Sequence, residues 1–119
     1  MPGMKIQTIN GVPVAVLDAE TIHTEQDALD RIGEISYVHQ ADRAVIPAEA
    51  LDPAFFQLRS GLAGAILQKF VNYGVRVAIA GDFSGYTSKA LRDFIRESNQ
   101  GRQVYFAATV EEALQRLSG

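Results

Sequence analysis

Residues 55–101, FFQLRSGLAGAILQKFVNYGVRVAIAGDFSGYTSKALRDFIRESNQG, hold the pattern that decides the fold. Apolar residues first recur at helical spacing, and the pattern stops at Gly74, because glycine favours the left-handed conformation that caps helix ends. Residues 75–80 (VRVAIA) alternate little, which is typical of a strand buried on both faces of a sheet. A polar loop, residues 81–89, then leads into a second helical pattern, whose core-facing side is expected to include Tyr86 and Phe94 and which ends at Gly101. This order of helix, strand, loop and helix predicts an α/β domain with parallel strands.

The residues before this stretch predict a β-hairpin and a helix. Asn10-Gly11 is the strongest two-residue hairpin signal, because both residue types tolerate positive φ. Apolar strands at residues 4–9 and 12–17 flank it. Thr24, with Asp27 three residues later, is then the expected N-cap of a helix.

The remaining elements complete an alternating pattern. Asp52-Pro53 predicts the start of a short helix through Leu58, with Asp as N-cap and Pro in the first helical position. Thr109 with Glu112 predicts a capping box for the last helix. Further strands are expected at residues 43–47 and 103–107. The predicted order is ββαβαβαβα: one domain over residues 1–119, with a mixed sheet and helices mainly on one face.

Composition narrows the classes of function. Of 119 residues, 47% are hydrophobic and 21% charged, which is ordinary for a globular protein. The absence of cysteine excludes disulfides and zinc–sulfur sites, and we expect neither a metal nor another cofactor. Net charge is −3, and Arg92, Arg96 and Arg102 alternate with Asp93 and Glu97, which predicts a solvated helix face. Nucleic acid is therefore not an expected partner.

Location and assembly are also expectations from the sequence. No apolar run has the length of a signal peptide core or the roughly 20 residues of a membrane span. We therefore expect a cytoplasmic protein without a membrane partner. The exposed edge of the N-terminal hairpin favours self-association, with a dimer as the simplest form.

Two long sequence words resemble a known family. The words FF-x-L-x-S-GLAG-x-ILQKF-x-NY and GDFS-x-x-TSK-x-L-x-DFI-x-ESN-x-G are similar to a bacterial family of small proteins of unknown function (domain of unknown function forty-one eighty). The likeness covers nearly the whole chain. It implies no established activity.

The element order also resembles STAS domains, the anti-sigma-factor-antagonist type of module. In these domains a serine at a helix start is the phosphorylated switch, and Ser60 in the word Arg59-Ser60-Gly61-Leu62 would align with it. The resemblance thus implies a STAS-like fold and a regulatory role for Ser60. From the residues alone, a helix-capping hydroxyl is favoured for Ser60 over a phosphorylation site.

The loop of residues 81–89 is the second candidate site. It follows a central strand, at the sheet edge where ligands of α/β proteins usually bind. Ser84, Thr87, Ser88 and Lys89 could contact a small anionic ligand, while Asp82 could bond local backbone amides. The alternative is a purely structural start of the next helix, capped by one of the hydroxyls. The spacing of a Walker loop is absent, which excludes that kind of ATPase site.

Three functions follow, in order of preference. The first is a non-enzymatic regulatory or protein-interaction module with Ser60 at its partner face. The second is a sensor of a small molecule or anion that uses loop 81–89. The third is an enzyme with Asp82, Tyr86 or Lys89 as acid–base groups, although no catalytic motif supports it.

Overall fold

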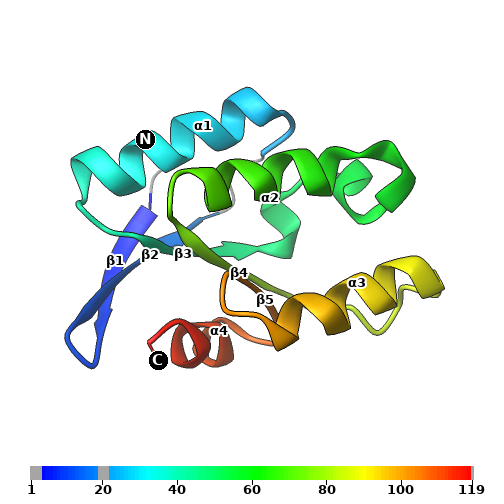
Figure 1. The fold of residues 1–119 in the computed structure, drawn as a ribbon. Helices are drawn as coiled ribbons and strands as arrows, with labels where there is room; N and C mark the ends of the chain where they lie inside the picture. Colours follow the sequence, from blue (N-terminus) through cyan, green and yellow to red (C-terminus); the bar gives the residue numbers. More distant parts are fainter. Residues whose placement is uncertain (1–3, 19–21, 119) are drawn as a thin grey trace.

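The protein is an α/β structure built on a five-stranded mixed sheet (Figure 1). The computed structural model describes residues 4–18 and 22–118, so segment 19–21 and both ends of the predicted 1–119 domain lie outside the described residues. The strands follow one another in sequence order; β1 and β2 are antiparallel, and all other neighbours are parallel. This confirms the predicted fold class. The strands are β1 (Met4–Ile9), β2 (Val12–Leu17), β3 (Arg43–Pro47), β4 (Arg76–Ala80) and β5 (Val104–Ala107).

Helices cover both faces of the sheet unequally. Figure 1 shows α1 and α2 side by side over one face, α3 along the β5 edge and α4 beneath the other face. The first helix ends in a π-helical segment, η1 (Glu34–Val38). In the described residues, no helix has the length and apolar character needed to cross a membrane. The α-helices are α1 (Glu25–Gly33), α2 (Leu62–Asn72), α3 (Lys89–Gln100) and α4 (Val110–Leu117).

The central strands separate two apolar cores. In β3, Ala44 and Ile46 face the core beneath α1, α2 and α3, whereas Val45 faces α4. All three side chains are 0% exposed. The burial of successive residues explains why the central strands read as continuous apolar runs.

The predicted turn and cap residues have the expected geometry. Asn10 and Gly11 have φ of 52° and 80°, as a tight hairpin turn requires. The Thr24 hydroxyl accepts a hydrogen bond from the Asp27 N–H, and the Asp27 carboxylate accepts one from the Thr24 N–H. Gly74, with φ of 70°, ends α2 in the left-handed conformation.

Two local predictions were wrong. Residues 53–58 do not form one helix, because Gln57 is extended and divides the segment into 3-10 turns. Tyr86 is not on α3, which begins at Lys89; its ring lies in the preceding loop against Phe56. Tertiary ring packing prevails here over the local helical pattern.

The edge strand β5 is held by a side chain from α3. The Asn99 amide nitrogen donates to the Phe106 carbonyl at 3.2 Å, and its oxygen accepts from the Phe106 N–H at 2.7 Å. Asn99 thus satisfies both backbone groups that no neighbouring strand pairs.

Arg102, predicted on a helix face with Arg92 and Arg96, lies beyond the end of α3.

Candidate functional site

Three short 3-10 turns follow β3 at the carboxyl edge of the sheet. They are η2 (Ala48–Ala50), η3 (Pro53–Phe56) and η4 (Leu58–Ser60). As predicted, Asp52 is an N-cap with Pro in the next position, and its carboxylate accepts a hydrogen bond from the Ala54 N–H at 2.9 Å. The turns carry the chain across this edge before α2 begins.

Aromatic rings join these turns to the loop after β4. Phe56 stacks on Tyr86, with ring centroids 5.2 Å apart and an interplanar angle of 25°. Phe83 contacts Phe56 on one side and Phe106 on the other, with centroid distances of 5.9 and 5.4 Å. Such pairs add roughly 0.5–1.5 kcal/mol each beyond the area that they bury. The rings therefore fix the position of the loop relative to η3.

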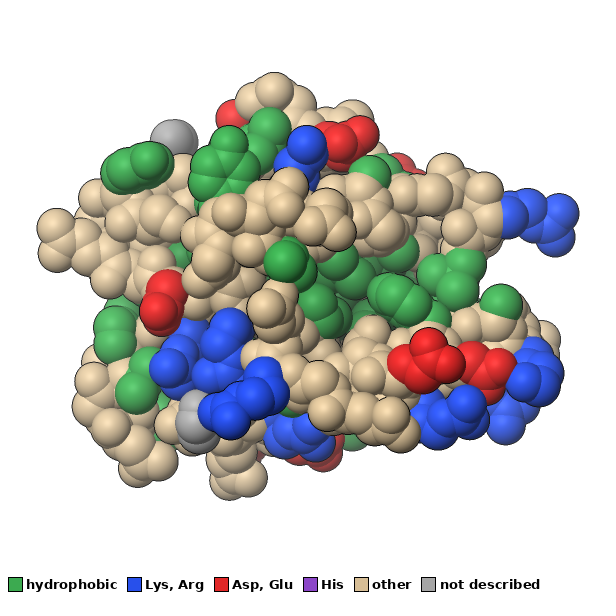
Figure 2. All heavy atoms as spheres, viewed as in Figure 1, with side chains coloured by type: hydrophobic (Ala, Val, Ile, Leu, Met, Phe, Trp, Pro, Cys, Tyr) green, Lys and Arg blue, Asp and Glu red, His purple; other side chains and the backbone are tan. Residues whose placement is uncertain are grey.

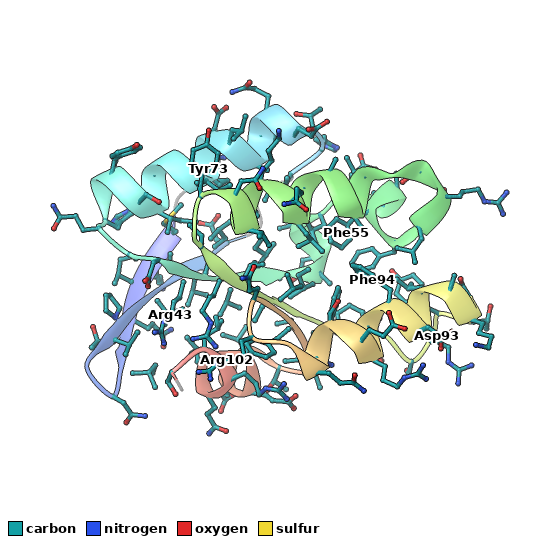
Figure 3. The ribbon with its side chains drawn as sticks, in the orientation of Figure 1. Arg43, Phe55, Tyr73, Asp93, Phe94 and Arg102 are labelled. Carbon is teal, nitrogen blue, oxygen red and sulfur yellow. The ribbon has the colours of Figure 1, made fainter. Side chains whose placement is uncertain are left out.

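A groove lies between these turns and the start of α3. Its volume is about 650 Å³. In Figure 2, hydrophobic side chains fill the hollow between α2 and α3, with charged groups along its lower rim, and Figure 3 places the labelled Phe55 and Phe94 in the region between these two helices. A second hollow of about 430 Å³ adjoins it on the other side of Phe56 and Tyr86. We call the first hollow the Phe56 groove; it is lined by Phe56, Gln57, Leu58, Arg59, Ser88 and Ala90.

Ser60 lies beside this groove and has two hydrogen-bonding roles. Its hydroxyl donates to the Ala54 carbonyl at 2.7 Å and accepts from the Leu62 N–H at 3.2 Å. The N-cap position itself belongs to Gly61, which has φ of 79°. Ser60 is nevertheless exposed, so the capping bond and access from solvent coexist.

The loop after β4 is ordered by its own carboxylate. Asp82 accepts hydrogen bonds from the Ser84 N–H at 2.9 Å and from the Ser84 hydroxyl at 2.6 Å. The hydroxyl first, and then the N–H, hold the pKa of Asp82 below its ordinary value. Asp82 and Ser84 thus bind each other within the turn.

The last three predicted residues of this loop have different surroundings. Ser88 is the N-cap of α3, where its hydroxyl accepts from the Leu91 N–H at 3.2 Å, and it also lines the Phe56 groove. The Lys89 ammonium pairs with Asp93 at 2.6 Å, and its side chain is 87% exposed. Thr87 is exposed. Of the loop residues predicted to bind a ligand, the groove lining includes only Ser88 among those the structure describes.

A histidine–carboxylate pair was not predicted from the sequence. His23 Nδ1 lies 2.6 Å from Asp52 Oδ2. This hydrogen bond first, and the Ala54 N–H second, hold the pKa of Asp52 below its ordinary value. The pair connects the segment before α1 to η3, beside the bridge between Ile22 and Leu51. Within residues 4–18 and 22–118, no group of three or more metal-ligating side chains gathers.

The groove unites two regions that sequence reasoning treated separately. Arg59, the neighbour of Ser60, and Ser88 line the same hollow although they are far apart in the sequence. The adjacent phenylalanines at positions 55 and 56 can be seen in the sequence, but the stacking of Phe56 on Tyr86 cannot.

Comparison with known proteins identifies the family. The chain matches the model described as Domain of unknown function (DUF4180) over residues 9–117, and it belongs to that family. This confirms the resemblance found in the two sequence words. A search of curated proteins found no match.

Proposed function

We propose that this DUF4180 protein is a non-enzymatic regulatory module that binds a partner protein in the Phe56 groove, and that phosphorylation of Ser60 switches this binding. The main support is the groove itself, which combines an apolar floor at Phe56 and Leu58 with a polar rim at Arg59 and Ser88. An apolar centre within a polar rim is the usual composition of a protein–protein interface.

Arg59 gives the groove a preference for acidic partners. Its guanidinium is exposed and makes no ion pair or hydrogen bond with the part of the chain that the structure describes. Arginine at an interface binds carboxylates with two parallel hydrogen bonds. We therefore expect the partner segment to carry an apolar residue for the groove floor and an acidic residue for Arg59.

Phosphorylation of Ser60 would change this rim directly. A phosphate group removes the hydroxyl donor to Ala54 and adds about −1.5 to −2 charge. The new charge would lie at the N-terminus of α2 beside Arg59, where both groups stabilise it. Because the phosphate then competes for Arg59, we expect it to weaken binding of an acidic partner.

Loop 81–89 has less support as a separate anion sensor. The Ser84 donors bind Asp82, and the Lys89 ammonium binds Asp93. An anion at this loop would have to displace both contacts and approach the Asp82 carboxylate.

Affinity capture from the native host, with matched variants, tests the proposal. Ala90→Glu places a charge in the groove at an exposed position, and Ala108→Glu makes the same change at an exposed position outside the groove lining. Quantitative mass spectrometry should find a protein that the wild type and Ala108→Glu retain and Ala90→Glu loses. Identical sets of bound proteins for all three would contradict the groove as partner face.

The switch is tested separately with Ser60→Asp and Ser60→Ala. We expect the aspartate variant to lose the groove-dependent partner and the alanine variant to keep it. Unchanged binding by Ser60→Asp would count against the switch while leaving the groove proposal intact.

A further inference from the structure

Four arginines gather at the opposite end of the sheet from the Phe56 groove. Arg43 and Arg76 begin β3 and β4, Arg102 precedes β5, and Arg116 lies in the last turn of α4. Figure 2 shows Lys and Arg side chains clustered on this side, and Figure 3 places Arg43 and Arg102 there. The cluster is notable because the whole chain has a net charge of −3.

Tyr105 holds two of these guanidinium groups in fixed positions. The Arg116 and Arg76 guanidinium carbons lie 4.5 and 5.6 Å from the centre of its ring. Arg76 also donates to the Tyr105 hydroxyl at 3.0 Å, and Arg116 donates to the Asn99 carbonyl at 2.9 Å. These contacts reduce the entropy that the side chains would lose on binding a ligand.

Arg102 lines a cavity beside this framework. The cavity has a volume of about 260 Å³ and lies between the turns that precede β4 and β5. The Arg76 Nε donates to the Arg102 carbonyl at 2.7 Å, which fixes the backbone of Arg102. The Arg102 guanidinium itself makes no ion pair or hydrogen bond with any residue in the described ranges. The lining consists of Val71, Gly74, Val75, Arg76, Arg102 and Gln103.

The Asp42 carboxylate and the carbonyls at the end of α2 each have another partner, so Arg102 is available to bind an anion. Asp42 lies 3.5 Å from Arg43 and is therefore engaged with a different arginine. The carbonyls of Lys69, Phe70 and Val71 at the end of α2 accept the hydrogen bonds that cap the helix.

We propose that this cavity binds a small molecule through a phosphate or carboxylate group. Arg102 would bind two oxygens of the anion, the geometry that guanidinium groups favour. The apolar wall at Val71 and Val75 would contact the rest of the ligand, which the volume limits to a small molecule. The site is independent of the proposed function, because it shares no lining residue with the Phe56 groove.

Calorimetric titration at low ionic strength tests the site. The probes are inorganic phosphate, glycerol 3-phosphate and succinate, so that phosphate and carboxylate recognition are measured separately. Arg102→Gln removes the guanidinium that we propose binds the anion. Arg92→Gln is the matched control, since Arg92 is exposed on α3 and lies outside the cavity lining. Circular dichroism would confirm that both variants are folded.

We expect at least one probe to bind the wild type and Arg92→Gln alike, and to bind Arg102→Gln about tenfold or more weakly, as loss of a charged hydrogen bond predicts. The probe with the highest affinity identifies the anionic group. Failure of all three probes to bind at about 10 mM, far above the concentrations at which specific sites fill, would overturn the proposal. Equal loss in both variants would also overturn it, because that result indicates only general charge attraction.

Discussion

Gly81→Ala tests how closely the end of β4 approaches the turns that form the groove. A Cβ added at Gly81 would lie 2.6 Å from the Ala48 Cβ, whereas ordinary contact begins at 3.4 Å. Neither Cβ can rotate away, because each is attached directly to the backbone. The end of β4 and η2 must therefore separate by roughly 1 Å to restore van der Waals contact.

The expected cost follows from this overlap. Overpacking a buried contact costs about 1–3 kcal/mol, and the loss of glycine flexibility in the unfolded chain offsets about 0.4–1 kcal/mol of it. We expect Gly81→Ala to lower the free energy of unfolding by about 1–2 kcal/mol, or the Tm by roughly 4–8 °C. Urea denaturation followed by far-UV circular dichroism measures it.

Gly85→Ala is the matched control in the same loop. A Cβ at Gly85 would meet no atom within 4 Å. This variant should be as stable as the wild type or more stable by up to about 1 kcal/mol. Equal stability of the Gly81 and Gly85 variants would refute the reasoning, because it would show that η2 does not press against the end of β4.

Two further predictions concern hydrogen bonds that connect distant segments. Asn99→Ala removes both bonds to the Phe106 backbone and should lower the free energy of unfolding by about 2–3 kcal/mol. The exposed Asn72→Ala should change it by less than about 0.5 kcal/mol. Equal effects of the two substitutions in urea denaturation would contradict the role of Asn99 in holding β5. The second concerns Asp52, whose pKa the folded state lowers, first through the hydrogen bond to His23. Its ionised form therefore stabilises the fold above the unfolded pKa, and this contribution is lost as pH falls below about 4. Asp52→Asn should make the decrease of Tm with falling pH less steep in this range. An unchanged slope would contradict the stabilising role of the Asp52 carboxylate beside His23.

The fold could be predicted because its signals are local. The turn at Asn10-Gly11, the Thr24 cap and the Gly74 helix end each depend on a few neighbouring residues. The apolar character of strands β3 and β4 likewise reflects the burial of successive residues in the middle of each strand. These patterns together determine the order of elements and the mixed sheet.

The site was harder to predict because its contacts join distant segments. The Tyr86 ring continues the apolar pattern of the following helix, so its stacking on Phe56 cannot be read from local spacing. His23 and Asp52 are 29 positions apart. Arg102 follows two helical arginines in the sequence but lies beside Arg76 of β4 in space. Such pairings are visible only when the strands have been placed in order.

Site-specific photocrosslinking in the native host tests the groove as partner face most directly. A photoreactive benzoylphenylalanine would replace exposed Gln57 in the groove, which leaves Arg59 in place, or exposed Gln115 on α4 as the control. The account predicts a crosslink to one protein from position 57 alone, suppressed by excess wild-type protein but not by excess Ala90→Glu. Crosslinks of equal yield from position 115, or suppression by Ala90→Glu as efficient as by the wild type, would contradict it.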